Sequence, residues 1–221
     1  MLLFHGEVTR QLLEKERVLA EKERQLAEKR IAMALSQLKP HFLYNVLNSI
    51  YYLCDKNPSL AQNAVSYFSE YLRNNMASIE IKTLIPFDEE LKHIESYLNL
   101  EKIRFKDLNI KYDIKTTAFM CPPLSVQPLV ENAVKHGIAK KKGGGTVVIS
   151  TLELSDAYVI KVADSGIGFI PNSYSDGKIH IGINNVKERI ANMADGTLTI
   201  NSELGIGSIA IITLPKKEKR K

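Results

Sequence analysis

His41 is the residue of this chain best suited to chemistry, because it places an imidazole on the polar side of an otherwise apolar helix. At about 100° per residue, a helix over residues 41–54 aligns His41 with Asn45, Asn48 and Tyr52. The other sides carry two apolar rows, with Leu43, Leu47, Ile50 and Cys54 in one and Phe42, Val46 and Leu53 in the other. Free imidazole is mostly neutral near pH 7 and is then a competent nucleophile. A plain exposed surface histidine is the alternative interpretation.

Pro40 stands directly before this histidine. Proline donates no backbone N–H and crowds the carbonyl group four residues earlier, here that of Ser36. We therefore predict a kink in the helix one residue before His41.

A second candidate site lies in residues 127–137, which read Q-P-L-V-E-N-A-V-K-H-G. On a helix, Asn132 and Lys135 are three residues apart and share one face. An amide oxygen and an ammonium group on one face suit a magnesium-bound polyphosphate, since the oxygen can join the hydrated metal and the ammonium can neutralise phosphate charge. The alternative is a plain helix end with a cationic last turn and Gly137 as its cap.

Two glycine-containing segments follow. Asp164-Ser165-Gly166-Ile167-Gly168 comes directly after residues 158–163, which alternate like a half-buried strand. A carboxylate at a strand end, followed by glycines that allow close backbone approach, can accept a hydrogen bond from an amino-bearing ring such as adenine. The same residue types also make ordinary turns. Further on, Gly182 is expected to precede a helix whose free N–H groups would bind phosphate, and Gly205-Ile206-Gly207-Ser208 comes after that helix.

These segments together resemble one family. The string K-P-H-F-L-Y-N-V-L-N around His41 resembles the phosphoacceptor segment of bacterial sensor histidine kinases of the LytS and YesM type. The later segments resemble, in the expected order, the N box, the two glycine boxes and the terminal Gly-x-Gly-Ser/Thr of the histidine-kinase ATP-binding domain. That fold is shared with gyrase-type ATPases. The resemblance covers roughly residues 30–215.

The resemblance implies a role for individual residues. His41 would accept the phosphoryl group, Asn132 would be the Mg²⁺ ligand, and Asp164 would bind the amino group of ATP's adenine. Asn45, one turn after His41, would position the water that attacks a phospho-aspartate, with a solvated asparagine as the alternative. The other residues implied to bind or surround the nucleotide are Lys135, His136, Gly166, Gly168, Gly182, Asn185, Gly205 and Gly207.

The chain departs from the family pattern at three positions. His180 stands where the second glycine box often has glycine, either as a donor to phosphate or as an exposed residue. Pro128 stands four residues before Asn132, where hydrolytic relatives such as gyrase carry a general-base glutamate, so phosphoryl transfer to a side chain is favoured over free ATP hydrolysis. Phe42 follows His41 where Glu or Asp is commonest, so no general base for His41 is visible.

Composition sets the outer limits. At 221 residues with 44% apolar content, the chain can form one ordinary domain and a smaller helical unit. Cys54 and Cys121 lack metal-ligand spacing and are expected to be reduced thiols in the cytoplasm. We identify no apolar run long enough to span a membrane and no signal-peptide core, although the resemblance implies that such modules often follow a membrane sensor. The net charge of +5 resides largely in residues 216–221, predicted to be a solvated basic tail that binds no nucleic acid.

Four regions are expected along the chain. Residues 1–34 repeat leucine every seven residues, at Leu12, Leu19 and Leu26, which predicts either a signalling helix with a weak coiled-coil seam or a solvated single helix. Residues 35–85 are predicted to hold two helices, 41–54 and 60–77, and two such hairpins would form a four-helix bundle in a homodimer. Residues 86–215 would form the ATP-binding domain.

The pattern after residue 85 completes an α+β protein. Asp88 is expected to cap a helix whose Leu91, Ile94 and Leu98 face inward. Strands are expected at 109–114, 146–154, 157–163, 197–201 and 209–214, with helices around Asn132 and Asn185 and a mobile connection at 143–145. This order predicts an α/β sandwich with helices covering one face of one sheet.

The sequence therefore predicts the transmitter part of a two-component system. ATP would bind the C-terminal domain, His41 would attack the γ-phosphate, and the phosphoryl group would pass to an aspartate of a response-regulator receiver domain. A regulatory ATPase without protein phosphotransfer, and a degenerate kinase that only dimerises or binds a partner, are the two alternatives.

Overall fold

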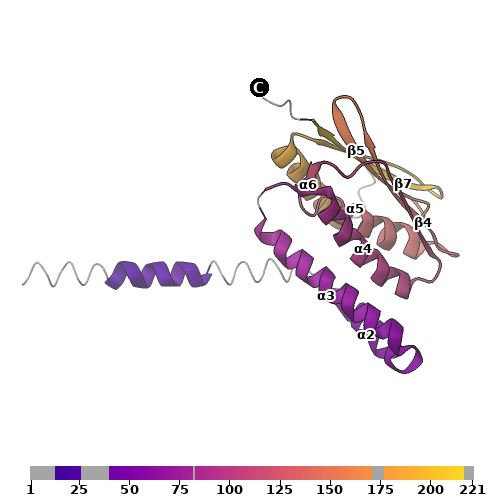
Figure 1. The fold of residues 1–221 in the computed structure, drawn as a ribbon, viewed down its shortest axis with the longest axis horizontal. Helices are drawn as coiled ribbons and strands as arrows, with labels where there is room; N and C mark the ends of the chain where they lie inside the picture. The colour runs from indigo at the N-terminus through magenta and orange to yellow at the C-terminus, as the bar shows by residue number, and fades with distance from the viewer. Residues whose placement is uncertain (1–12, 26–39, 82, 171–176, 217–221) are drawn as a thin grey trace, which may run out of the picture. The chain divides into compact units, whose positions relative to one another are not determined.

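The computed structural model describes residues 13–25, 40–81, 83–170 and 177–216. The chain divides into two compact units, residues 1–44 and 45–221, and each is described by itself. In the first unit, residues 13–25 form a helix (Figure 1). Their side chains are exposed. The rest of the predicted heptad repeat lies outside the described residues, and so does residue 39, before Pro40, so the predicted kink at Pro40 stays a prediction.

Two long helices come next. Helix α2 spans Pro40–Lys56 and α3 spans Pro58–Glu80, so both extend beyond the predicted limits. Helix α3 begins with Pro58, whose missing N–H costs little in the first turn of a helix. Asn57 caps α3, since its side-chain oxygen accepts a hydrogen bond from Leu60 N at 3.0 Å.

The two predicted apolar rows of α2 differ in their exposure. Val46 is buried and Leu53 is half-buried, so this row packs within the chain. Leu47 is 53% exposed and Cys54 is also exposed. The row that contains them is therefore partly exposed in a single chain, since Leu43 and Ile50 are half-buried.

Helix α4 (Phe87–Arg104) follows the short strand β1 (Ile85–Pro86), which pairs with β3 (Met120–Cys121). The predicted cap at Asp88 is wrong, because Pro86 occupies the N-cap position and Asp88 lies within the first turn. Its charge there can still interact favourably with the helix dipole. Ile94 and Leu98 are buried as predicted, whereas Leu91 is only half-buried.

Five strands form one mixed sheet in the order β2-β4-β5-β7-β6. β2 and β4 are parallel, and the other neighbours are antiparallel. Buried residues alternate along the central strands, as a half-buried sheet requires. All five lie close to the predicted limits: β2 (Leu108–Ile114), β4 (Gly145–Glu153), β5 (Ala157–Asp164), β6 (Thr197–Glu203) and β7 (Gly207–Pro215).

Helices α4, α5 (Gln127–Asn132) and α6 (Gly177–Ala194) lie on one face of this sheet, which confirms the predicted sandwich (Figure 1). Helix α3 packs along α4, so the predicted domain limit between residues 85 and 86 separates two helices in contact. That limit, the one between residues 34 and 35 and the mobility of residues 143–145 stay predictions. Within the described part of the chain, no helix is long and apolar enough to cross a membrane.

Both cysteines are free. Cys121 is buried, and this burial raises the pKa of its thiol well above the ordinary value. Such a thiol stays protonated and unreactive, in line with the predicted structural role.

Candidate functional site

Asp164 is the last residue of β5, beside Val147 of β4 and Ser208 of β7. Its side chain is 8% exposed, and its carboxylate accepts hydrogen bonds from Gly166 N at 2.8 Å and from the Ser208 hydroxyl. These two bonds hold the carboxylate in one orientation. An ionised carboxylate can accept more than two hydrogen bonds. Asp164 can therefore accept a further hydrogen bond from a ligand, at the place that the strand pattern predicts.

Gly137 determines how closely the segment after Asn132 approaches this carboxylate. A Cβ atom on Gly137 would lie 2.5 Å from Asp164 Oδ1, and Gly137 O also accepts a hydrogen bond from Ile167 N at 3.2 Å. Gly137 has a φ of −89° and Ile138 occupies the C-cap position, so the alternative interpretation of Gly137 as a helix cap is wrong. Glycine is required there because the Asp164 carboxylate occupies the space of a side chain.

Gly207, the first residue of β7, brings the β6–β7 hairpin against Asp164. Its φ is +138°, and a Cβ atom there would overlap the carbonyl oxygen of Asp164. Gly205 N donates to Ile167 O at 2.7 Å, and Gly168 lies against the carbonyl of Glu203. The structure thus places Gly137, Gly166 and Gly207 directly against Asp164, while Gly168 and Gly205 join the Asp164 loop to the β6–β7 hairpin.

Asn132 is half-buried and ends α5. The predicted α-helix through Gly137 is wrong: Ala133–Gly137 form a π turn, because Ile138 N–H bonds to the carbonyl of Ala133, five residues earlier. Asn132 and Lys135 are therefore not related by α-helical spacing. Lys135 is exposed and His136 is half-buried. Single π turns inside helices are frequent at functional sites.

Gly182 and Asn185 lie within α6, which already begins at Gly177. The prediction that Gly182 precedes a helix start is therefore wrong, since beyond the first turn the backbone N–H groups are used inside the helix. Both residues are exposed. Their part in nucleotide binding stays a prediction, and the side chain of His180 lies outside the described residues.

Glu90 is a supporting residue that the sequence analysis missed. It is fully buried, and its carboxylate accepts hydrogen bonds from Leu124 N at 2.8 Å, Val126 N at 2.8 Å and Gln127 N at 3.2 Å. Glu90 thereby holds the backbone that leads into α5. One sequence signal could have found it: Glu90 lies three residues after Phe87 and four before Ile94, on their apolar face.

Two cations from other elements also hold these loops. Arg189 of α6 donates to the carbonyl oxygens of Pro123 at 3.1 Å and Leu124 at 2.9 Å, where Leu124 has a φ of +52°. Lys141 donates from Nζ to the carbonyl oxygen of Ser165 in the Asp164 loop. All three bonds join segments more than twenty residues apart, so no local pattern reveals them.

His41 and Asn45 lie on α2 as the polar stripe predicts. His41 is exposed and belongs to the first compact unit. Asn45 is half-buried at the start of the second unit. An exposed imidazole can meet a substrate without any rearrangement of its own helix.

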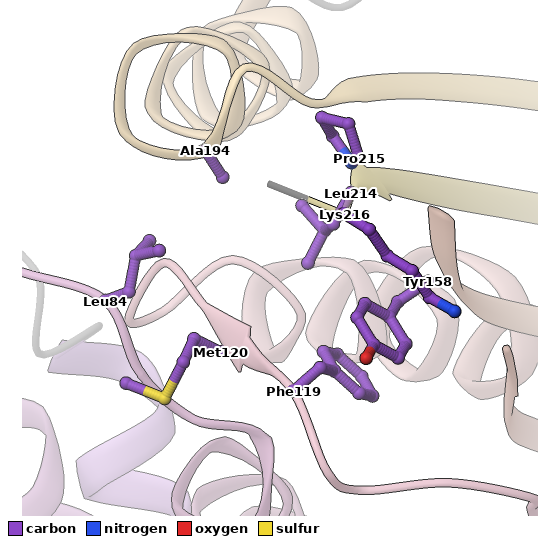
Figure 2. A pocket seen from close by; sticks show the side chains of 8 residues that line it. All are labelled: Leu84, Phe119, Met120, Tyr158, Ala194, Leu214, Pro215 and Lys216. Carbon is purple, nitrogen blue, oxygen red and sulfur yellow. The ribbon is translucent and has the colours of Figure 1, made fainter. Parts of the chain in front are cut away.

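A cavity of about 300 Å³ lies beside β5 and β7 (Figure 2). Tyr158 and Leu214 line the cavity and lie opposite each other on β5 and β7. Their position is six residues along these strands from the paired residues Asp164 and Ser208, at the other end of the sheet. Phe119 stacks on Tyr158 at 4.8 Å between ring centroids. This mostly apolar cavity is therefore separate from the candidate nucleotide site.

Comparisons with known proteins agree with this geometry. A model of the histidine kinase family matches residues 29–109, and a model of the histidine kinase-, DNA gyrase B- and HSP90-like ATPases matches residues 124–218. The histidine kinase domain of the blue-light activated histidine kinase from Erythrobacter litoralis EL346 has a similar fold, with a TM-score of 0.50 at 13% identity over 77% of this chain and 94% of that one.

Three relatives are similar in sequence. YwpD, an uncharacterized protein of Bacillus subtilis (strain 168), is 38% identical over 80% of this chain and 67% of its own length. The sensor histidine kinase YpdA of Escherichia coli (strain K12) is 42% identical over 62% of this chain and 24% of its own length. The sensor protein LytS of Staphylococcus saprophyticus is 31% identical over 78% of this chain and 30% of its own length.

The chain thus spans less than a third of the two sensor proteins that it matches. The two family models lie in the same order as the candidate sites, with His41 inside the first match and both Asn132 and Asp164 inside the second. The ATPase-type domain implies the use of ATP. The chain belongs to the family of sensor histidine kinases of the LytS type.

Proposed function

We propose that this chain is the transmitter part of a two-component system, in which ATP phosphorylates His41 and the phosphoryl group passes to an aspartate of a response-regulator receiver domain. The observation that supports this most is the packing of the Asn132 segment against the buried Asp164 carboxylate in an ATPase-type domain. A base could bind at Asp164, with phosphates along the neighbouring segment. A membrane sensor that feeds its signal into this chain is part of the same proposal.

Each site residue has a physical role in this proposal. Asp164 would accept a hydrogen bond from the adenine amino group, with Gly166, Gly168, Gly205 and Gly207 keeping the surrounding backbone close. Asn132, Lys135 and His136 would contact the metal and the phosphates. Gly182 and Asn185 would border the nucleotide from α6.

The residues of the site also fit Mg²⁺. In the part of the chain that is described, no group of three or more His, Cys, Asp or Glu side chains could enclose a metal ion. Magnesium seldom needs such a cage, since it keeps several waters and binds through one or two protein oxygens and the substrate phosphates. The half-buried amide of Asn132 can supply one such oxygen. When bound, the ion would neutralise charge on the phosphates.

The transfer itself requires little from the protein beyond positioning. One ring nitrogen of His41 forms a bond to the γ-phosphorus, the bond from that phosphorus to the bridging oxygen breaks, and ADP leaves. The proton on the other ring nitrogen is lost to water. Holding the nucleotide and the imidazole together would then supply much of the rate.

The neighbourhood of Asn132 favours transfer over hydrolysis. Pro128 of α5 stands where a hydrolytic enzyme would carry its general base, and proline cannot activate water. The adjacent Glu131 is buried and accepts a hydrogen bond from Gln127 Nε2 at 2.9 Å, so its carboxylate is engaged within the interior.

Incubating the purified chain with γ-labelled ATP and Mg²⁺ tests the proposed function. We expect label on the protein that is lost in acid and persists in alkali, because a phosphoramidate has this lability. Release of labelled phosphate without labelled protein would instead favour a regulatory ATPase. Neither product would favour a binding module.

Asp164→Asn is expected to weaken ATP binding by roughly 1.5–3 kcal/mol, about 10- to 150-fold in Kd, because a charge-assisted hydrogen bond to the base is lost. Calorimetric titration measures the change. Asp156→Asn is the matched control, since Asp156 is exposed in the β4–β5 turn and should leave Kd unchanged. Equal affinity in wild type and Asp164→Asn would remove the adenine assignment.

Asn45→Ala is expected to retain most autophosphorylation and to lose dephosphorylation of the response regulator. An amide one turn after His41 can orient a water toward a phospho-aspartate docked there, but it is poorly placed to take the proton of His41. The half-life of a phosphorylated receiver domain, with unphosphorylated kinase and ADP, measures this. If wild type shortens that half-life and the variant does so equally, Asn45 has no such role.

A homodimer is expected, because α2 and α3 expose apolar side chains on the surface of a single chain. Leu47, Tyr51 and Val65 are 53%, 81% and 48% exposed. Light scattering at micromolar concentration should give twice the chain mass of 24.9 kDa. Leu47→Glu should yield a folded monomer, whereas Ser155→Glu, in an exposed turn, should stay dimeric. A folded wild-type monomer would contradict the bundle.

A further inference from the structure

Three buried polar side chains join α3 to α5. Asn75 of α3 and Gln127 and Glu131 of α5 are 5%, 1% and 6% exposed. Gln127 Nε2 donates to Glu131 Oε1 at 2.9 Å and to Asn75 Oδ1 at 3.4 Å. We refer to Asn75, Gln127 and Glu131 as the polar junction.

The direction of each bond in the polar junction is defined. Asn75 Nδ2 donates to the carbonyl oxygen of Tyr71, one turn earlier in α3, at 2.8 Å. This bond orients the Asn75 amide so that its oxygen faces α5. Gln127 then places its amino group between two acceptors, one from each helix. Rotating or sliding α5 against α3 would separate this donor from at least one acceptor.

Helix α5 depends on such contacts for its position. It has only six residues, too few to be stable by itself. Its N-terminal end is held by the carboxylate of Glu90, and its first residue, Gln127, bonds both to Asn75 of α3 and to Glu131 one turn later in α5. Asn132 is its last residue, directly after Glu131. The position of the Asn132 amide therefore depends on the same bonds.

The polar junction trades stability for a defined orientation. Burying amide and carboxylate groups costs free energy that apolar side chains would not cost, whereas a hydrogen-bonded set accepts only one arrangement. Neighbouring groups extend the polar region along α4, where Arg104 makes bonds of 2.9 and 3.0 Å to the two oxygens of the buried Glu101.

We propose that the polar junction is a positioning device, through which α3, the second helix of the phosphoacceptor hairpin, sets the place of the Asn132 amide for the magnesium–nucleotide complex. Asn75 and Gln127 are then positioning residues that act through Glu131 and Asn132. The inference rests on the proposed function, because it requires Asn132 to be the metal ligand. It adds a residue of α3 to those that control the nucleotide site.

The test is the ratio of the ATP Kd in EDTA to that in Mg²⁺, measured by calorimetry on the full chain. This ratio isolates the contribution of the metal, so a general loss of stability or a weaker adenine site would not lower it. Four proteins are compared: wild type, Asn132→Ala, Asn75→Ala and Asn63→Ala. Asn63 is an exposed asparagine of the same helix as Asn75 and is the matched control.

In wild type the ratio should exceed one, and in Asn132→Ala it should fall close to one. Asn75→Ala should lower the ratio roughly tenfold, the size usual for residues that orient a metal ligand, and Asn63→Ala should leave it unchanged. Circular dichroism checks folding, and Asn75→Ser serves if Asn75→Ala does not fold.

The two proposals fail in different ways. A wild-type ratio of one, or an unchanged ratio in Asn132→Ala, would remove Asn132 as the metal ligand and with it the basis of the inference. The polar junction alone would be overturned by a different result. In that case wild type and Asn132→Ala show the expected ratios, but Asn75→Ala and Asn75→Ser both have the wild-type ratio.

Discussion

His41→Gln should abolish the ATP-dependent, acid-labile labelling of the protein. Glutamine keeps a polar side chain on the exposed face of α2 but has no ring nitrogen that can hold a phosphoryl group. The loss should be complete, since the described structure offers no second histidine on the polar stripe of this helix. Scintillation counting of protein stopped in alkali measures the effect.

Two controls separate loss of the acceptor from loss of the nucleotide site. ATP affinity should be unchanged in His41→Gln, because the variant leaves the Asp164 site intact. His93→Gln, which removes a largely buried imidazole from α4, should still incorporate label. Labelling of His41→Gln with the same acid lability would show that another histidine is the acceptor.

Glu90→Ala should destabilise the second unit by about 3 kcal/mol or more, because each buried N–H group left without an acceptor costs about 1–3 kcal/mol. Three buried backbone N–H groups, those of Leu124, Val126 and Gln127, would lose their acceptor at once. Against a typical total of about 5–15 kcal/mol, this is a large part of the stability of a domain. Urea unfolding followed by circular dichroism measures it.

The neighbouring residue provides the control. Glu89 is exposed in the same first turn of α4, so Glu89→Ala should change the free energy of unfolding by less than about 0.5 kcal/mol. Glu90→Gln keeps one oxygen acceptor and the side-chain shape. Its loss of free energy of unfolding should therefore lie between those of Glu89→Ala and Glu90→Ala. Similar unfolding curves for Glu89→Ala and Glu90→Ala would show that the carboxylate of Glu90 does not hold α5.

Local patterns in the sequence predicted the elements that repeat along the chain. The pattern of apolar and polar residues predicted all five strands of the large sheet, and alternation over residues 158–163 placed Asp164 at the end of β5. Such patterns work because side chains of a strand or helix have a fixed period and one face must leave water. Helix ends were predicted less well, as the Asp88 cap and the start of α6 show.

Contacts between distant segments had no such pattern. Gly137 looked like a helix cap, but the Asp164 carboxylate, twenty-seven residues away in sequence, explains why it is glycine. Glu90 looked like one of three acids in a first turn, yet it holds backbone more than thirty residues ahead.

The sequence by itself thus determined the family, the sheet and the identity of the candidate residues, because residue types and their periods carry that information. Only the tertiary structure decided how Gly137, Gly207 and Asp164 meet, how Glu90 holds α5, and how Asn75 reaches Gln127 across fifty-two residues. The physical reason is that a hydrogen bond or a close backbone approach between two segments depends on where folding places both of them. The residues next to either partner in sequence do not indicate that contact.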